Sequence, residues 1–246
     1  MKTSNAILVI CSFLILSCKD QGTQPSANNT FFGWVDLYNE YGDTLVDRSN
    51  VVVTVENTSI TALSDSTGEW NLSNVPVGEL SLDFSKAGFG TYVQHHVIYS
   101  GGITKHSTLE IPLVQSPTYK VDSISMTLSV VDSSITVHGS VSELSKSSHG
   151  KTVVLYLGNG PTISSQPNEF SFLVEVNVQY GVLTFSKSIS INDLGDHGLR
   201  SGQKLLCVAY PSAEGAMFCY NDPLTGRLVV TSISQVPSNV VNIVVP

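Results

Sequence analysis

The sequence is poor in charged residues, which make up 13% of its 246 positions. Positive charge is especially scarce, because 12 Lys and Arg stand against 20 Asp and Glu and no stretch concentrates them. Nucleic-acid binding depends on clustered positive charge, so nucleic acid is excluded as an expected partner. Sustained helical periodicity is also missing. The abundant residues are Ser, Thr, Val, Asn and Gly, which favour strands and turns.

The apolar run at the N-terminus, Ala6–Leu16, is too short to cross a bilayer core. It follows Lys2 and precedes polar sequence, which is the arrangement of a signal peptide. Its end, Ile15-Leu16-Ser17-Cys18, resembles the lipobox of bacterial lipoproteins. The resemblance implies that residues 1–17 are removed, that Cys18 carries acyl chains such as palmitate, and that the exported protein is anchored in the outer membrane or at the cell surface. The alternative is an ordinary secretory signal with a chance cysteine.

Cysteine is scarce, with four residues in the chain. Cys11 would leave with the signal peptide and Cys18 would be acylated, which leaves Cys207 and Cys219. Because exported proteins meet an oxidising compartment, we expect a disulfide between these two. It would bridge the strands of a hairpin whose loop is Pro211–Gly215. The alternative is a pair of reduced cysteines in the core.

After the signal peptide comes a short polar segment, and a longer segment with alternating apolar residues and turn motifs follows it. Residues 18–30 lack apolar periodicity and are expected to form an acylated, flexible tether. Residues 31–115 resemble the carboxypeptidase regulatory-like domain, a small transthyretin-like β-sandwich. The matching motifs are the Thr/Ser-x-Asp-x-x-Gly-x-aromatic-x-Leu run at Leu63–Leu72, the turn at Asn74–Gly78, and Ser85–Phe89.

This resemblance implies structural roles for several residues. Gly68 and Gly78 are expected at turns with positive φ, while Trp70 and Leu72 are expected in the core. On this basis Gly78→Val should cost more stability than Gly158→Val, because Gly158 is expected in a looser turn. The long run Asn39–Asn50 departs from the family pattern and is either a functional loop or a longer turn.

Beyond Pro117, apolar and polar residues alternate in many short segments separated by turn signals, which predicts a second sandwich over residues 119–246. Gly198–Gln203 is similar to the approach to the penultimate strand in fibronectin type III domains, so an immunoglobulin/fibronectin type III-like domain is expected. The predicted fold class is therefore all-β, with two β-sandwich domains after a signal peptide and a flexible tether.

Signals of catalysis and metal binding are weak. The common hydrolase motifs are missing. His95 and His96 are adjacent in an expected strand, so they should point to opposite faces and not share a metal ion. The polar cluster at Asp193–His197 lacks the spacing of a calcium loop and is expected to be a solvated turn. No metal and no other cofactor is therefore expected.

Aromatic side chains offer the other candidate site. They could form a stacking platform for a sugar or a peptide, although core packing is the favoured interpretation. The candidates are Trp34, Tyr38, Tyr41, Tyr92 and Tyr99.

The sequence thus predicts a non-enzymatic lipoprotein, held to the membrane through lipid on Cys18 and acting as a binding or structural module. Its ligand would be a protein or a glycan. One alternative is a glycan-binding component of a surface nutrient-capture system. The other is an accessory protein of a hydrolase, or a small hydrolase whose site is built from residues around Asp193–His197.

Overall fold

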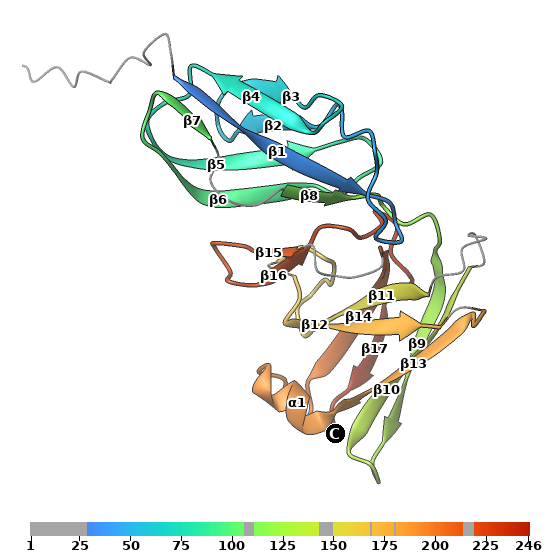
Figure 1. The fold of residues 1–246 in the computed structure, drawn as a ribbon. Helices are drawn as coiled ribbons and strands as arrows, with labels where there is room; N and C mark the ends of the chain where they lie inside the picture. Colours follow the sequence, from blue (N-terminus) through green and yellow to red (C-terminus); the bar gives the residue numbers. More distant parts are fainter. Residues whose placement is uncertain (1–28, 106–110, 143–149, 168, 180, 214–218) are drawn as a thin grey trace, which may run out of the picture.

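The computed structural model describes residues 29–105, 111–142, 150–167, 169–179, 181–213 and 219–246. Within these residues the chain forms 17 β-strands and one short α-helix (Figure 1). The predicted all-β class is therefore confirmed. Cys18 and residues 1–28 as a whole lie outside the described residues.

The first eight strands form one unit of two facing sheets. One sheet has the order β4-β1-β7, with β8 also paired to β1, and the other has the order β3-β2-β5-β6. The strands are β1 (Thr30–Tyr38), β2 (Val52–Val55), β3 (Thr61–Leu63), β4 (Glu69–Ser73), β5 (Gly78–Ser85), β6 (Tyr92–Tyr99), β7 (Ile103–Lys105) and β8 (Ile111–Val114).

The core of this first unit contains the residues that the family motif indicated. Trp70 and Leu72 are fully buried between the sheets, as predicted. Gly68 has φ +88° and Gly78 has φ +140°, which confirms the expected positive φ at both turns. The Asp65 carboxylate fixes the first turn, because it accepts hydrogen bonds from the backbone N–H groups of Thr67 (2.8 Å) and Glu69 (3.0 Å).

The remaining strands form a second unit. Its sheets have the orders β13-β10-β9 and β12-β11-β14-β17, and a separate hairpin pairs β15 with β16. The strands are β9 (Val121–Ser129), β10 (Ser134–Val141), β11 (Lys151–Gly158), β12 (Phe172–Val178), β13 (Thr184–Ser190), β14 (Lys204–Ser212), β15 (Cys219–Asn221), β16 (Leu228–Val230) and β17 (Val241–Val244).

The central strands β11 and β14 are buried on both faces. One face contributes Leu155 and Cys207 to the core between the two sheets, and the other contributes Tyr156 and Val208 to a second core that includes Val230 of β16. Gly158 belongs to this packed region, and a Cβ there would lie 3.2 Å from the Ile163 side chain. The expected loose turn at Gly158 is therefore wrong.

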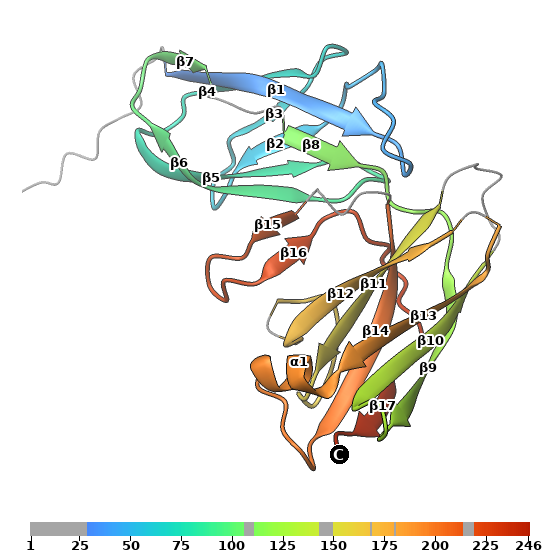
Figure 2. The same ribbon diagram turned by 60° about the horizontal axis from the view of Figure 1, so that its bottom comes forward.

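The two units share no sheet and are joined by close contacts. Buried Glu40 accepts hydrogen bonds from the Thr118 backbone N–H and hydroxyl, both at 2.7 Å. Gly90 lies so close to the second unit that a Cβ would be 1.8 Å from the Thr231 carbonyl oxygen. Figures 1 and 2 both show the β15–β16 hairpin lying between the units, beneath β5 and β6.

Candidate functional site

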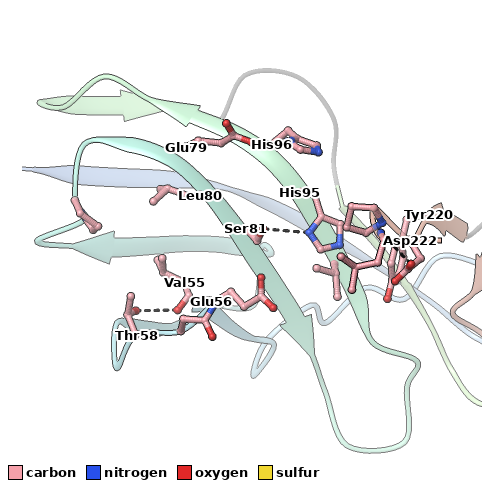
Figure 3. Close-up of a pocket in the computed structure, with 15 residues that line it drawn as sticks. Val55, Glu56, Thr58, Glu79, Leu80, Ser81, His95, His96, Tyr220 and Asp222 are labelled. Atoms are coloured by element: carbon pink, nitrogen blue, oxygen red, sulfur yellow. Dashed lines mark hydrogen bonds and ion pairs between the residues drawn. The ribbon is translucent and has the colours of Figure 1, made fainter. Parts of the chain in front are cut away.

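A β-bulge in β6 places two histidines on the same face of the sheet. Leu80 is paired with Val97 and Leu82 with Gln94, so His95 and His96 together oppose Ser81. His96 adopts the left-handed conformation at φ +59°. Both imidazoles consequently line one pocket on the outer face (Figure 3). The prediction that they point to opposite faces is wrong, because strict alternation does not hold across a bulge.

Each histidine has its own polar partner on β5. His95 Nδ1 lies 3.1 Å from the Ser81 hydroxyl, and His96 Nδ1 contacts the Glu79 carboxylate. The two rings are 6.5 Å apart between centroids. Within the described residues, no group of three His, Cys, Asp or Glu side chains is placed to hold a metal ion.

The pocket, called here the hairpin groove, runs between the outer face of β5–β6 and the β15–β16 hairpin. Its volume is about 680 Å³. The hairpin supplies Tyr220 and, in the turn that follows β15, Asp222 and Leu224. The first unit supplies mostly polar side chains, namely Glu56, Asn57, Thr58, Glu79, Ser81, His95 and His96.

Aromatic contacts position Tyr220 in this groove. Its ring packs edge-to-face against Tyr92 and against His95, with centroid separations of 5.8 Å in both cases. Tyr92 and His95 belong to β6 of the first unit, whereas Tyr220 belongs to β15 of the second. The site is therefore built from both units and depends on how they are joined.

Negative charge dominates the groove. Burial raises the pKa of the Tyr220 hydroxyl, and the nearby carboxylates of Asp222, Asp83 and Glu56 raise it further. Burial also raises the pKa of Asp83, with a further increase from Glu56 that His95 partly opposes.

Asp222 shows the opposite shift. Hydrogen bonds from the Thr225 hydroxyl (2.8 Å) and backbone N–H (2.7 Å) lower the pKa of Asp222 and keep it ionised. No Lys or Arg is among the groove-lining residues that the structure describes. A hydrogen-bond donor without negative charge therefore fits this site better than an anion does.

The two cysteines expected to form a disulfide are free thiols. Cys207 is paired with Leu157 on one side and Val241 on the other, so β14 has no free edge for the expected hairpin partner. Cys219 is instead paired with Val230, which packs on the opposite face of the central sheet from Cys207. The predicted pairing of Cys207 with Cys219 is wrong for this reason. Burial raises the pKa of the Cys207 thiol to about 12.

Three of the aromatic residues proposed as a platform, Trp34, Tyr92 and Tyr99, do not share one surface. Tyr99 is fully buried in the core of the first unit. Trp34 lies on the outer face of the other sheet, where the Lys105 ammonium is 4.5 Å from its ring centroid. Of the five candidates, Tyr92 reaches the hairpin groove region through its contact with Tyr220.

The polar cluster at Asp193–His197 forms part of a short helix rather than a simple turn. Helix α1 spans Ile191–Asp196 and is capped by Ser190, whose hydroxyl accepts a hydrogen bond from the Asn192 N–H (3.1 Å). The His197 ring stacks on Phe172 at 4.4 Å between centroids. Asp193 and His197 line one pocket together with Phe172 and Lys187, and within the described chain no side-chain hydrogen bond joins the two.

The run Asn39–Asn50 contributes to the junction rather than to the groove. The Asn39 side chain accepts hydrogen bonds from the backbone N–H groups of Tyr41 and Asp43, both at 2.9 Å, which makes a local turn. Glu40 in that turn holds Thr118 of the linker between the units.

No protein-family model and no curated protein matches the sequence. Among solved structures, a candidate carbohydrate-binding protein from Bacteroides uniformis is 14% identical, with 88% of this chain and 99% of that chain covered and a TM-score of 0.32. DUF3823 family proteins from Bacteroides ovatus and Parabacteroides merdae are 14% and 11% identical. They cover 89% and 87% of this chain and 100% and 97% of their own, with TM-scores of 0.34 and 0.29. At these TM-scores the comparisons assign no ligand to this chain, and its site is interpreted from its own residues.

Proposed function

We propose that this chain is a lipid-anchored, extracytoplasmic and non-enzymatic binding module that holds a glycan segment in the hairpin groove. The observation that carries the proposal is the groove itself. It combines the half-buried ring of Tyr220 with a row of hydrogen-bonding side chains on β5 and β6.

Glycans match this chemistry in two ways. The C–H face of a sugar ring packs against an aromatic ring, while its hydroxyl groups donate to carboxylates and accept from imidazole or hydroxyl donors. Glu56 and Asp222 supply acceptors, and Ser81 and His95 supply groups that donate or accept. Since Lys and Arg are missing from this lining, the ligand is expected to be neutral rather than sulfated or uronic.

Replacing Tyr220 tests the site. Tyr220→Ala in the chain 19–246 is expected to weaken binding of neutral oligosaccharides by roughly tenfold, or ~1.4 kcal/mol, because the stacking surface is lost. Isothermal titration calorimetry against neutral and acidic oligosaccharides measures this, with Val131→Ala on a distant turn as the control. Equal affinity of Tyr220→Ala and the parent chain would contradict the groove assignment. Binding of acidic oligosaccharides alone would contradict the ligand class.

The membrane anchor is proposed from the lipobox-like sequence at Cys18. The acyl chains contribute about 0.8 kcal/mol for each buried methylene, and two or more chains hold a protein stably. In the part of the chain that the structure describes, no helix is long and apolar enough to cross a membrane.

Cys18→Ala is therefore expected to move the protein from the membrane fraction to the soluble fraction. Immunoblotting of both fractions after a high-salt wash measures the change. Retention of the variant in the washed membranes would contradict lipid anchoring at this residue.

The first unit is proposed to be a carboxypeptidase regulatory-like sandwich. This proposal is supported by the positive φ at Gly68 and Gly78 and by the burial of Trp70 and Leu72.

A further inference from the structure

Three exposed apolar side chains lie at one end of the first unit. The exposed fractions are 53% for Val77, 67% for Ile98 and 77% for Ile103. Val77 precedes β5, Ile98 is near the end of β6 and Ile103 begins β7. Figure 1 shows this end beside the start of β1, away from the second unit.

The turn Ser100–Gly102 joins the ends of β6 and β7, which carry Ile98 and Ile103, and Val77 lies beside it. A Cβ on Gly101 would lie 3.1 Å from Val77 Cγ2, so Val77 lies against the turn. Ile98 is paired with Glu79. Glu79 follows Val77 by two residues, so Val77 and Ile98 are diagonal neighbours on the outer face of the sheet. Ile103 follows the turn at the start of β7, where it is paired with Thr30 on the outer face of the other sheet. Val77, Ile98 and Ile103 are called the apolar tip.

The apolar tip carries no charge. The segments that converge on it, residues 29–35, 73–78 and 97–104, contain no Asp, Glu, Lys, Arg or His. The nearest charged residues along the strands are Glu79 and Lys105. The three apolar side chains can leave water without burying an ion only if the carboxylate of Glu79, the strand partner of Ile98, stays hydrated.

The chain enters the fold at the apolar tip. The Asn29 side chain donates to the Val75 carbonyl (3.2 Å) and accepts from the Gly102 N–H (3.1 Å), and the Thr30 N–H donates to the Gly102 carbonyl (2.8 Å). Asn29 follows Cys18 by eleven residues. Eleven residues span at most about 40 Å when fully extended, so a lipid on Cys18 keeps the apolar tip close to the bilayer.

We propose that the apolar tip docks on the lipid bilayer and inserts its three side chains at the headgroup boundary. The inference rests on the proposed lipid anchor. The anchor holds the tip near the bilayer and so raises its effective concentration at the membrane surface. A small apolar surface is therefore sufficient for docking. Lys105, which flanks the tip, supplies a positive charge toward anionic headgroups.

Tryptophan quenching tests the docking. Ile103→Trp is placed in the mature lipidated protein on phosphatidylethanolamine–phosphatidylglycerol vesicles whose acyl chains are brominated. Val131→Trp is the matched control, because Val131 is 95% exposed on the β9–β10 turn at the other end of the molecule (Figure 1). We expect the added emission of Ile103→Trp to be quenched at least threefold more than that of Val131→Trp.

A second arm separates this proposal from the anchor. The chain 19–246 with an N-terminal hexahistidine tag is held on nickel-chelating lipid, which supplies a tether without Cys18. If the native protein does not remain on membranes but Ile103→Trp is quenched on the nickel vesicles, the lipid anchor fails and the docking stands. Equal quenching of both tryptophans in bound protein overturns the docking. A dimer in sedimentation that Ile103→Ser abolishes also overturns it, because the tip would then bind a second copy.

Discussion

Gly68 occupies a place where the backbone of the first unit leaves no room for a side chain. Its φ is +88°, and a Cβ there would lie 2.2 Å from the Val35 carbonyl oxygen. The Val35 N–H in turn donates to the Gly68 carbonyl at 3.0 Å. The turn before β4 is thereby fixed against the middle of β1, and both the conformation and the space require glycine.

Gly68→Ala is expected to destabilise the first unit by about 2 kcal/mol or more, since the left-handed conformation alone costs about 1–2 kcal/mol for alanine. Urea unfolding followed by tryptophan fluorescence reports this unit selectively, because both tryptophans, Trp34 and Trp70, belong to it. Gly195→Ala is the control, as Gly195 lies in α1 with open space around it. An unchanged midpoint for Gly68→Ala would show that the turn can move.

At the level of strands and turns, alternation in the sequence predicted most of the second unit. Ile124 and Met126 alternate with serine and threonine, and the structure has β9 there. Alternation does not show which strands are neighbours in a sheet. The proposed pairing of Cys207 with Cys219 failed because β11 and β17 occupy both edges of β14, and these partners are distant in sequence.

The bulge in β6 left no clear trace in the sequence, because apolar Val93 and Ile98 face outward and polar Gln94 faces inward. The core-directed positions are Tyr92 and Gln94 before the histidines, and Val97 and Tyr99 after them, so the period changes phase at His95–His96. A bulge produces such a phase change, and here it is seen in the strand register rather than in the pattern of apolar residues. Tyr220 and Asp222 could not be found from the sequence either, because their place in the groove depends on a hairpin of one unit reaching the other.

At the scale of the whole molecule, the groove depends on a junction that is tightly packed. Glu40 binds Thr118 beside the linker, and Gly90 touches the backbone at Thr231. These contacts fix where the β15–β16 hairpin meets β6. The geometry around Tyr220 is therefore set in advance, which would lower the entropy lost on binding the proposed ligand.

Gly90→Ala is expected to separate the two units without unfolding either, because its Cβ would overlap the Thr231 carbonyl. Small-angle X-ray scattering of the chain 19–246 should show a larger maximum dimension, while the urea midpoint from tryptophan fluorescence stays close to that of the parent. Gly195→Ala should leave both measurements unchanged. A scattering profile identical to the parent for Gly90→Ala would mean that the junction tolerates the methyl group.

The parallel pairing of β1 has a consequence for the order in which the chain can fold. Val35 and Leu37 of β1 are paired with Ile111 and Leu113 of β8, the last strand of the unit. A chain that crosses a membrane with its N-terminus first therefore exposes the C-terminal half of β1 until β8 has emerged. If the chain is exported as proposed, this unit folds only after its whole length has crossed the membrane, because the loop between β1 and β8 must close before their contacts stabilise the unit.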